Sequence, residues 1–205
     1  RAVAALGLGA EALRTVYQVH GAKVIHVDAP WADPPRCDAM VTNRPGIALG
    51  ILAADCAPVL FADAGAGIVG AAHAGWKGAL AGVVQATVGA MLALGARREG
   101  IAAALGPAIA QSSYEVGPGF STPFLAQNPG NADFFVGSAR PGHFMFDLPG
   151  YITGVLEGLG LGAVSVLAED TCGDPARFFS YRRATHCGEP DYGRSLSAIA
   201  LTAQE

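Results

Sequence analysis

A central segment constrains the fold of this chain more than any other part. Three short apolar runs, over residues 47–53, 58–62 and 68–73, are separated by two short segments, the first containing Asp and the second Asp and Gly, which favour turns. A longer Ala- and Val-rich run follows and stops at a glycine, which predicts a helix over residues 78–95. The sequence therefore predicts buried strands in succession, followed by a helix.

The same kinds of pattern predict further elements. Two β-rich runs, residues 13–19 and 23–27, flank His20, Gly21 and Ala22, which predicts a hairpin with His20 at its turn. The other predicted strands cover residues 101–105, 114–116, 164–168, 178–182 and 196–201, and the other predicted helices cover residues 1–9, 120–126 and 148–159.

Length and composition predict one folded domain over residues 1–205. Hydrophobic residues make up 51% of the chain and charged residues 15%, well below the ~25% charged residues of average soluble domains, which excludes a disordered chain. The net charge of −4 and the lack of a dense Lys/Arg run argue against a partner that is a nucleic-acid polymer. The longest apolar stretch is rich in Gly and Ala, so we expect no membrane helix.

The cysteines indicate a compartment. Cys37, Cys56, Cys172 and Cys187 form no CxxC pair and no dense cluster. This pattern favours reduced thiols over a disulfide framework, so we expect a cytoplasmic protein.

Three residues beside predicted strand ends suggest a metal site: His20, Cys56 and His73. Strand ends are where sheets present functional groups, so the three side chains are expected to converge. One thiolate and two imidazoles suit Zn²⁺, and three protein ligands leave a fourth position for water, as in catalytic sites. Water held there becomes acidic enough to supply hydroxide near neutral pH.

Two other interpretations of these residues stay open. A single Cys in an apolar run is most often a small core residue, and a single His at a turn is most often a surface group. Alternatively, Cys56 and His73 form the nucleophile and base of a cysteine hydrolase, which leaves His20 without a role.

Basic residues near two predicted turns are candidates for anion binding. Lys77 stands between Gly75 and Gly78 at the start of a predicted helix, where backbone amides and a lysine suit a phosphate. Two glycines at such a turn are also common for steric reasons alone. Arg182 and Arg194 lie near a predicted strand end, and guanidinium groups suit phosphate or carboxylate through forked hydrogen bonds.

These motifs together resemble one family. QVHG, ADCAPVLFAD, AAHAGWKG, LGPAI, YEVG and FFSYRR followed by GR occur in the order found in YfiH-type proteins, which carry the label laccase-domain or multicopper polyphenol oxidase proteins. The resemblance spans residues 20–201. It implies an α+β fold, with a single domain of packed mixed β-sheets and flanking helices, and a zinc-type site at the residues that match His20, Cys56 and His73.

The resemblance also implies an activity. Members of the family are regarded as purine nucleoside phosphorylases that cleave adenosine, inosine, guanosine and methylthioadenosine with phosphate, and that also deaminate adenosine. Deamination needs a hydroxide that attacks C6 of adenine, and phosphorolysis needs cations around the phosphate, for which Lys77, Arg182 and Arg194 are the candidates. The expected partners are a purine nucleoside and phosphate. The expected cofactor is zinc, with copper as an adventitious occupant.

Two further residues receive roles beside the expected metal site. Asp55 is expected to orient a ligand imidazole or to act as a general base, with a turn aspartate bonded to the backbone as the structural alternative. Gln18 lies two residues before His20, which places both side chains on one face of a strand and predicts contact of Gln18 with a purine edge.

The sequence departs from the family pattern in two places. Arg194 follows Arg183 by 11 residues, a longer spacing than is typical of the family. An STRxGG-like segment at the N-terminus of the family has no counterpart here, so we expect part of the usual pocket to be missing.

Five histidines are too few for a type 1 copper site and a trinuclear cluster, which excludes four-copper oxidase chemistry. A metal-stabilised binding domain is the non-enzymatic alternative.

Overall fold

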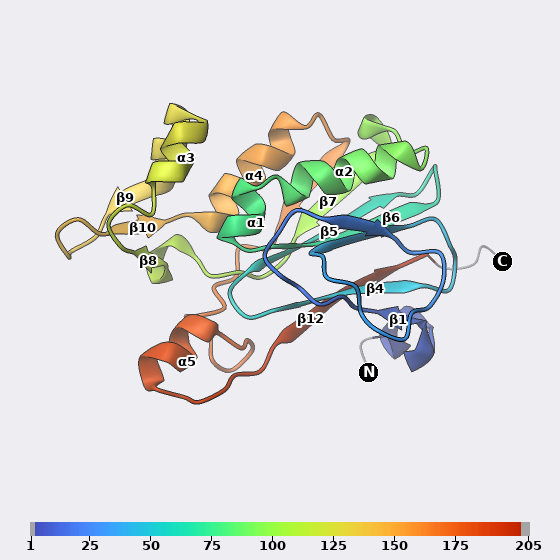
Figure 1. Ribbon diagram of the computed structural model, residues 1–205, viewed down its shortest axis with the longest axis horizontal. Helices are drawn as coiled ribbons and strands as arrows, with labels where there is room; N and C mark the ends of the chain where they lie inside the picture. The colour runs from blue at the N-terminus through green and yellow to red at the C-terminus, as the bar shows by residue number, and fades with distance from the viewer. Residues whose placement is uncertain (1–2, 202–205) are drawn as a thin grey trace.

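A six-stranded mixed sheet forms the centre of the computed structural model, which describes residues 3–201 (Figure 1). The strand order is β11-β7-β5-β6-β3-β2. The four inner strands are antiparallel to one another, whereas each edge strand is parallel to its neighbour. The strands cover Val24–His26 (β2), Ala39–Thr42 (β3), Ala57–Asp63 (β5), Ile68–Ala74 (β6), Ile101–Leu105 (β7) and Ala163–Val166 (β11).

Two further layers cover this sheet. Helices α1 (Trp76–Leu80), α2 (Val83–Ala93) and α4 (Leu148–Gly158) lie over one face (Figure 1). A three-stranded sheet of order β1-β4-β12 covers part of the other face. In that sheet, β1 pairs in parallel with β4, and β12 pairs in antiparallel register with β4. Its strands are Leu13–Arg14 (β1), Ala48–Ala53 (β4) and Ser195–Ala200 (β12).

The alternation of side chains along the central strands explains these layers. Val41 and Phe61 belong to the core beneath the helices, together with Met91 of α2. Met40, the neighbour of Val41, packs instead with Leu49 of β4. Because successive strand residues point to opposite faces and both faces of β3, β5 and β6 are covered, these three strands are largely apolar.

A third, smaller sheet lies at one end of the molecule beside helix α3 (Thr122–Gln127) (Figure 1). Phe120, Phe124 and Phe146 pack with ring centroids 4.9 to 5.7 Å apart. Phe124 also meets Tyr151 of α4 edge to face, at 5.1 Å. These aromatic contacts attach the small sheet to the main body. Its strands are Glu115–Val116 (β8), Phe135–Gly137 (β9) and Phe144–Phe146 (β10).

The hairpin predicted over residues 13–27 is wrong. Strands β1 and β2 belong to different sheets, and each pairs in parallel with a strand further along the chain. The link between them curls around the carboxylate of Asp38, which accepts the backbone N–H groups of Val19, His20 and Gly21. His20 takes a left-handed φ of 61° at this curl. The pattern located β2, but β1 ends at Arg14, five residues before the predicted end, and β3, the partner of β2, was not predicted.

The strand predicted over residues 178–182 is also wrong. That segment leads into helix α5, Tyr181–Cys187, whose N-cap is Ser180. The Ser180 hydroxyl accepts the backbone N–H of Arg183 at 3.1 Å. This cap starts a helix in a sequence whose aromatic residues favour a strand.

Two predicted helices differ in extent from those observed. The helix predicted over residues 78–95 is divided into α1 and α2, because Gly82 between them takes a φ of 89°. The helix predicted over residues 1–9 is a short 3₁₀ turn, Ala4–Leu6, and residues 1 and 2 lie outside the described part of the chain.

The remaining predicted elements are confirmed to within two residues at each end. Within residues 3–201, none of the helices has the length and apolar character needed to cross a lipid bilayer.

Candidate metal centre

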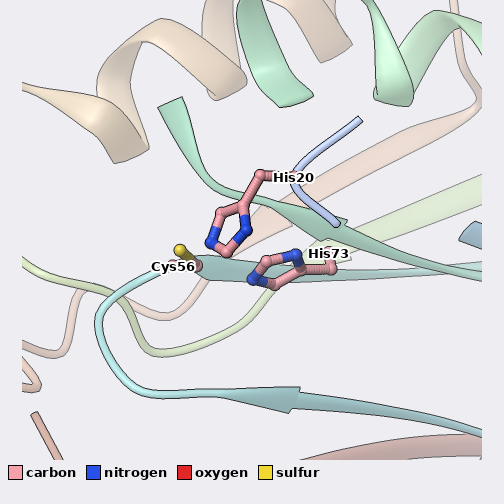
Figure 2. A group of neighbouring side chains, drawn as sticks. All are labelled: His20, Cys56 and His73. Atoms are coloured by element: carbon pink, nitrogen blue, oxygen red, sulfur yellow. The ribbon is translucent and has the colours of Figure 1, made fainter. Parts of the chain in front are cut away.

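Three side chains from distant parts of the chain meet at one end of the central sheet. His20 lies in the link between β1 and β2, Cys56 in the loop between β4 and β5, and His73 on β6. One ligand atom of each lies within 4.8 Å of the other two. Figure 2 shows the Cys56 sulfur beside the two imidazole rings, whose centroids are 4.8 Å apart. The structure thus brings the three candidate ligands together.

A buried aspartate, Asp38, supports two of these three residues. Its Oδ1 lies 2.9 Å from His73 Nδ1 and accepts the His20 backbone N–H at 2.8 Å. Its Oδ2 accepts the backbone N–H groups of Val19 and Gly21. Burial would raise the pKa of Asp38, but the bonds from His73 and from three N–H groups outweigh it and lower the pKa. An ionised acceptor at this place keeps a proton on His73 Nδ1 and leaves Nε2 for a metal.

Two glycines of the HAGWKG motif permit the close approach of these segments. A Cβ atom on Gly75 would lie 2.8 Å from Cys56 Sγ and 3.0 Å from His20 Cδ2. A Cβ atom on Gly78 would lie 2.9 Å from the Gly21 carbonyl oxygen. A larger residue at either position would push the candidate ligands or their backbone apart. The lack of room for a side chain at this centre therefore explains why both positions are glycine.

The donor set fits a borderline metal ion such as zinc. A thiolate and two imidazoles are preferred zinc ligands. Burial, and then the carboxylates of Asp55 and Asp38, raise the pKa of the Cys56 thiol to about 12, so a positive charge is needed to hold the thiolate. Burial and the neighbouring His73 lower the pKa of His20, which favours the neutral, ligating imidazole. Within the described residues, no fourth His, Cys, Asp or Glu joins the group.

His20 and Cys56 lie in the wall of a cavity of about 690 Å³, a volume typical of small-molecule sites. The cavity is lined by both polar and aromatic side chains. Its polar lining includes Asp55, Lys77, Glu115 and Arg182, and its aromatic lining consists of Trp76, Tyr114, Phe120, Tyr181 and Tyr192.

Asp55 holds the start of helix α5 against this cavity. One carboxylate oxygen accepts the Thr171 hydroxyl at 2.7 Å, and the other accepts the Ser180 hydroxyl at 3.0 Å and the Arg182 backbone N–H at 2.6 Å. Asp55 itself takes a left-handed φ of 84°. Its carboxylate is therefore occupied in positioning the chain. The imidazole that was expected to be oriented by Asp55 is oriented by Asp38.

The two cations expected near a phosphate, Lys77 and Arg182, both line the cavity. Lys77 is exposed, with its Nζ 5.5 Å from the centre of the Trp76 ring. The Arg182 guanidinium donates to the Glu115 carbonyl at 2.8 Å and lies over the Tyr114 ring. The structure places both positive charges at the same cavity as two of the candidate metal ligands.

The other two expected ligand contacts are not part of the cavity lining. Both amide atoms of Gln18 pair with the backbone of Leu52 in β4, at 2.7 and 3.0 Å, which ties the segment before His20 to that strand. Arg194 is exposed and stacks over the Tyr192 ring at 4.7 Å. Arg194 therefore contacts a residue of the cavity wall, Tyr192, without itself lining the cavity.

Two residues of the site, Asp38 and Tyr114, were not predicted from the sequence. Asp38 precedes β3, which was not predicted, and its partner His73 lies 35 residues away. Tyr114 lines the cavity, and burial raises its pKa well above the usual value, so its hydroxyl stays neutral. An ionisable residue between the apolar Cys37 and Ala39 was the one available signal for Asp38.

Comparison with known proteins identifies the family. A model of the family described as multi-copper polyphenol oxidoreductase laccase matches residues 1–202. The chain belongs to this family. The YfiH-type resemblance drawn from the motifs is thereby confirmed, as is the α+β fold that it implied.

Individual members of the laccase family show how far the similarity extends. A Deinococcus radiodurans protein named purine nucleoside phosphorylase is 42% identical over 207 aligned residues, which cover 100% of this chain and 76% of that protein. A Rickettsia conorii protein with the same name is 38% identical over 184 residues, covering 90% of this chain and 76% of that protein. Among solved structures, YlmD from Geobacillus stearothermophilus has a TM-score of 0.87 at 27% identity, covering 99% of this chain and 78% of that one. YfiH from Bacillus licheniformis has a TM-score of 0.86 at 25% identity, covering 98% and 78%.

Proposed function

We propose that this protein is a zinc-dependent purine nucleoside phosphorylase that also deaminates adenosine. The observation that carries the proposal is one cavity whose wall combines candidate metal ligands with the cations Lys77 and Arg182. The names of the relatives from Deinococcus radiodurans and Rickettsia conorii support the phosphorylase part. The four free cysteines agree with action in the cytoplasm.

Phosphorolysis requires an anion held beside C1′ of the nucleoside. A phosphate oxygen forms a bond to C1′ while the bond from C1′ to the base nitrogen breaks, and the base leaves with the bonding electrons and takes up a proton. We assign phosphate binding to Lys77 and Arg182, because charge-assisted hydrogen bonds from ammonium and guanidinium groups suit phosphate oxygens. The contacts of Arg182 with Glu115 and Tyr114 hold its guanidinium in place at the cavity before phosphate arrives.

Deamination requires activated water. His20, Cys56 and His73 would hold the ion, and Asp38 keeps His73 in the ligating tautomer. A zinc ion held by these residues supplies Lewis-acid activation of water, the chemistry that removal of the adenosine amino group needs. Copper can occupy the same donor set adventitiously. One Cys and two His are not the ligand set of a four-copper oxidase, despite the name of the family.

The two alternative functions are less compatible with the site. A cysteine hydrolase needs a thiol whose pKa is lowered, whereas burial raises the pKa of Cys56 to about 12. A structural metal site is closed by a fourth protein ligand, and the described residues supply three.

Product analysis tests the proposal. Purified protein is loaded with zinc and given adenosine with and without phosphate, and the products are separated by chromatography. We expect about one zinc per chain, adenine and ribose 1-phosphate only when phosphate is present, and inosine without phosphate. Cys56→Ala should reduce both activities roughly 100-fold or more.

Cys187→Ala is the matched control, since Cys187 is exposed at the end of α5 and should leave both activities unchanged. Zinc binding without turnover of any purine nucleoside would contradict the proposal and favour a binding domain. Activity that survives chelation but is lost on thiol alkylation would favour the cysteine hydrolase.

A further inference from the structure

Two tyrosines in the cavity wall lie together without a role in metal or phosphate binding. Tyr181 begins helix α5, and Tyr192 lies in the loop that leads to β12. Their ring centroids are 5.2 Å apart at an interplanar angle of 62°, an edge-to-face arrangement. Tyr181 is 53% exposed. We propose that Tyr181 and Tyr192 form a stacking surface that binds the purine base. This inference rests on the proposed function and assigns the base to one part of its cavity.

The tyrosine pair is held rigidly on the helix side. The residues on both sides of Tyr181 donate to one carboxylate, because the Ser180 hydroxyl and the Arg182 backbone N–H both bind Asp55. Asp55 precedes Cys56, a candidate metal ligand. The position of Tyr181 relative to the metal centre is therefore fixed through two adjacent residues, and little conformational freedom is lost when a ligand binds.

The loop side is held by packing. A Cβ atom on Gly193 would overlap the Phe179 ring, so the loop beside Tyr192 rests directly on the segment that leads into α5. The guanidinium of Arg194 covers one face of the Tyr192 ring at 4.7 Å. Tyr181 is 53% exposed, so part of its ring surface is open to a planar ligand.

The chemistry of this surface selects the base rather than the phosphate. The faces of aromatic rings carry negative charge density and do not attract anions. Purines have large π faces, and stacking on an aromatic side chain is a common way to bind them. Lys77 and Arg182 supply the positive charge for phosphate in the same cavity. A nucleoside thus finds a planar contact for its base and cations for the attacking phosphate.

Binding of free adenine, measured by calorimetry without phosphate, tests the inference independently of turnover. We expect Tyr181→Leu and Tyr192→Leu to weaken adenine binding by about 5- to 100-fold each, which is the range for loss of one stacking contact. Tyr181→Phe and Tyr192→Phe keep the ring and should bind adenine within about twofold of the unmodified protein. The KM for phosphate in the phosphorolysis assay should be unchanged in all four variants.

Tyr17→Leu is the matched control. Tyr17 is 58% exposed and is also covered by an arginine, Arg36, at 4.7 Å, but it is not part of the cavity lining. This variant should bind adenine as the unmodified protein does. Melting temperatures of all variants, measured by circular dichroism, show that each is folded.

Three outcomes separate this inference from the proposed function. If adenine binds and the leucine variants lose it, the inference holds even where phosphorolysis is not detected, and only the proposed activity fails. If the leucine variants bind adenine normally, the inference is overturned while phosphorolysis can stand. A changed oligomeric state with normal adenine binding would show that the tyrosines contact a second protein chain and would also overturn it.

Discussion

At the scale of single residues, Asp38 has the widest influence, because one carboxylate accepts hydrogen bonds from the His73 ring and from the backbone around His20. Asparagine at this position replaces one acceptor oxygen with a donor group. We expect Asp38→Asn to lower zinc affinity about 10- to 100-fold, the usual effect of losing a supporting carboxylate. Competition with a chromophoric chelator measures this affinity without reference to catalysis.

Asp63→Asn is the control for that experiment. Asp63 is as well buried as Asp38, at 3% against 0% exposure, and it also accepts backbone N–H groups. It ends β5, whereas Cys56 precedes the start of the same strand. Equal zinc affinities in the Asp38 and Asp63 variants would show that Asp38 does not position the ligands.

Gly75 gives a steric test of the same centre. An added methyl group would lie 2.8 Å from Cys56 Sγ, and such overpacking typically costs about 1–3 kcal/mol. We therefore expect Gly75→Ala to weaken zinc binding by about 5- to 100-fold. Gly89→Ala in α2 meets no atom within 4 Å and should leave zinc affinity unchanged while stabilising the helix by ~0.5–1 kcal/mol. A Gly75→Ala protein with normal zinc affinity would contradict this packing.

At the scale of elements, three of the four inner strands of the central sheet could be predicted from sequence because they are largely apolar, whereas the fourth, β3, was not predicted. Uninterrupted apolar runs between turn residues mark β5, β6 and β7. Their partners could not be predicted in the same way. The pattern over residues 13–27 is equally typical of a hairpin, and parallel pairing with β3 and β4 depends on contacts with distant residues.

The start of helix α5 shows a different limit of prediction from sequence. Phe178, Phe179 and Tyr181 favour a strand by residue type, but Ser180 caps a helix and donates its hydroxyl to Asp55. Asp55 lies 125 residues earlier in the chain. A tertiary hydrogen bond of this kind outweighs local propensity and leaves no periodic signal in the sequence.

The carboxylate of Asp63 links two elements and predicts an acid dependence of stability. The backbone N–H groups of Arg97 and Ala66 donate to it and lower its pKa below the model-peptide value of 3.8. Its stabilising effect is therefore complete above that value and is lost as the pH falls through the lowered, folded-state pKa.

We expect Asp63→Asn to unfold at lower urea concentration than the unmodified protein at pH ~6, with a difference that shrinks towards pH ~3. Asp133→Asn, at an exposed position, is the control and should show no difference at either pH. A difference for Asp63→Asn that is the same at both pH values would rule out the ionised carboxylate as its cause.

At the scale of the whole molecule, the candidate ligands join segments that are far apart in the chain. His20 lies in the link between the two main sheets, and Cys56 and His73 lie in a loop and a strand of the central region. An ion bound only by the folded state stabilises it by about 2.7 kcal/mol when its free concentration is 100 times the dissociation constant. For a chain of this length, we expect chelation of zinc to lower the melting temperature by about 5–10 °C.

The control for chelation is Cys56→Ala. Its melting temperature should not respond to chelator, because one of the three ligands is missing. A chelator effect of equal size in this variant would mean that the stabilising ion binds elsewhere.

The candidate site could be predicted only in part. The three metal ligands are visible in the sequence because Cys and His are unusual beside buried strands, and Lys77 and Arg182 are visible as charges beside turns. The residues that support them are not. Asp55 binds Thr171 and Arg182, which lie 116 and 127 residues further along, and spacing within the chain carries no record of such distances.

Asp55 and Cys56 are consecutive, yet the first holds the start of α5 and the second is a candidate metal ligand. One peptide unit, about 3.8 Å between Cα atoms, therefore sets the reach between the two halves of the cavity. Loops at the rim, such as the one before β12, can lengthen or shorten without altering that reach. A single inserted residue between positions 55 and 56 would alter it, so this dipeptide sets the spacing between the carboxylate that anchors α5 and the candidate metal centre.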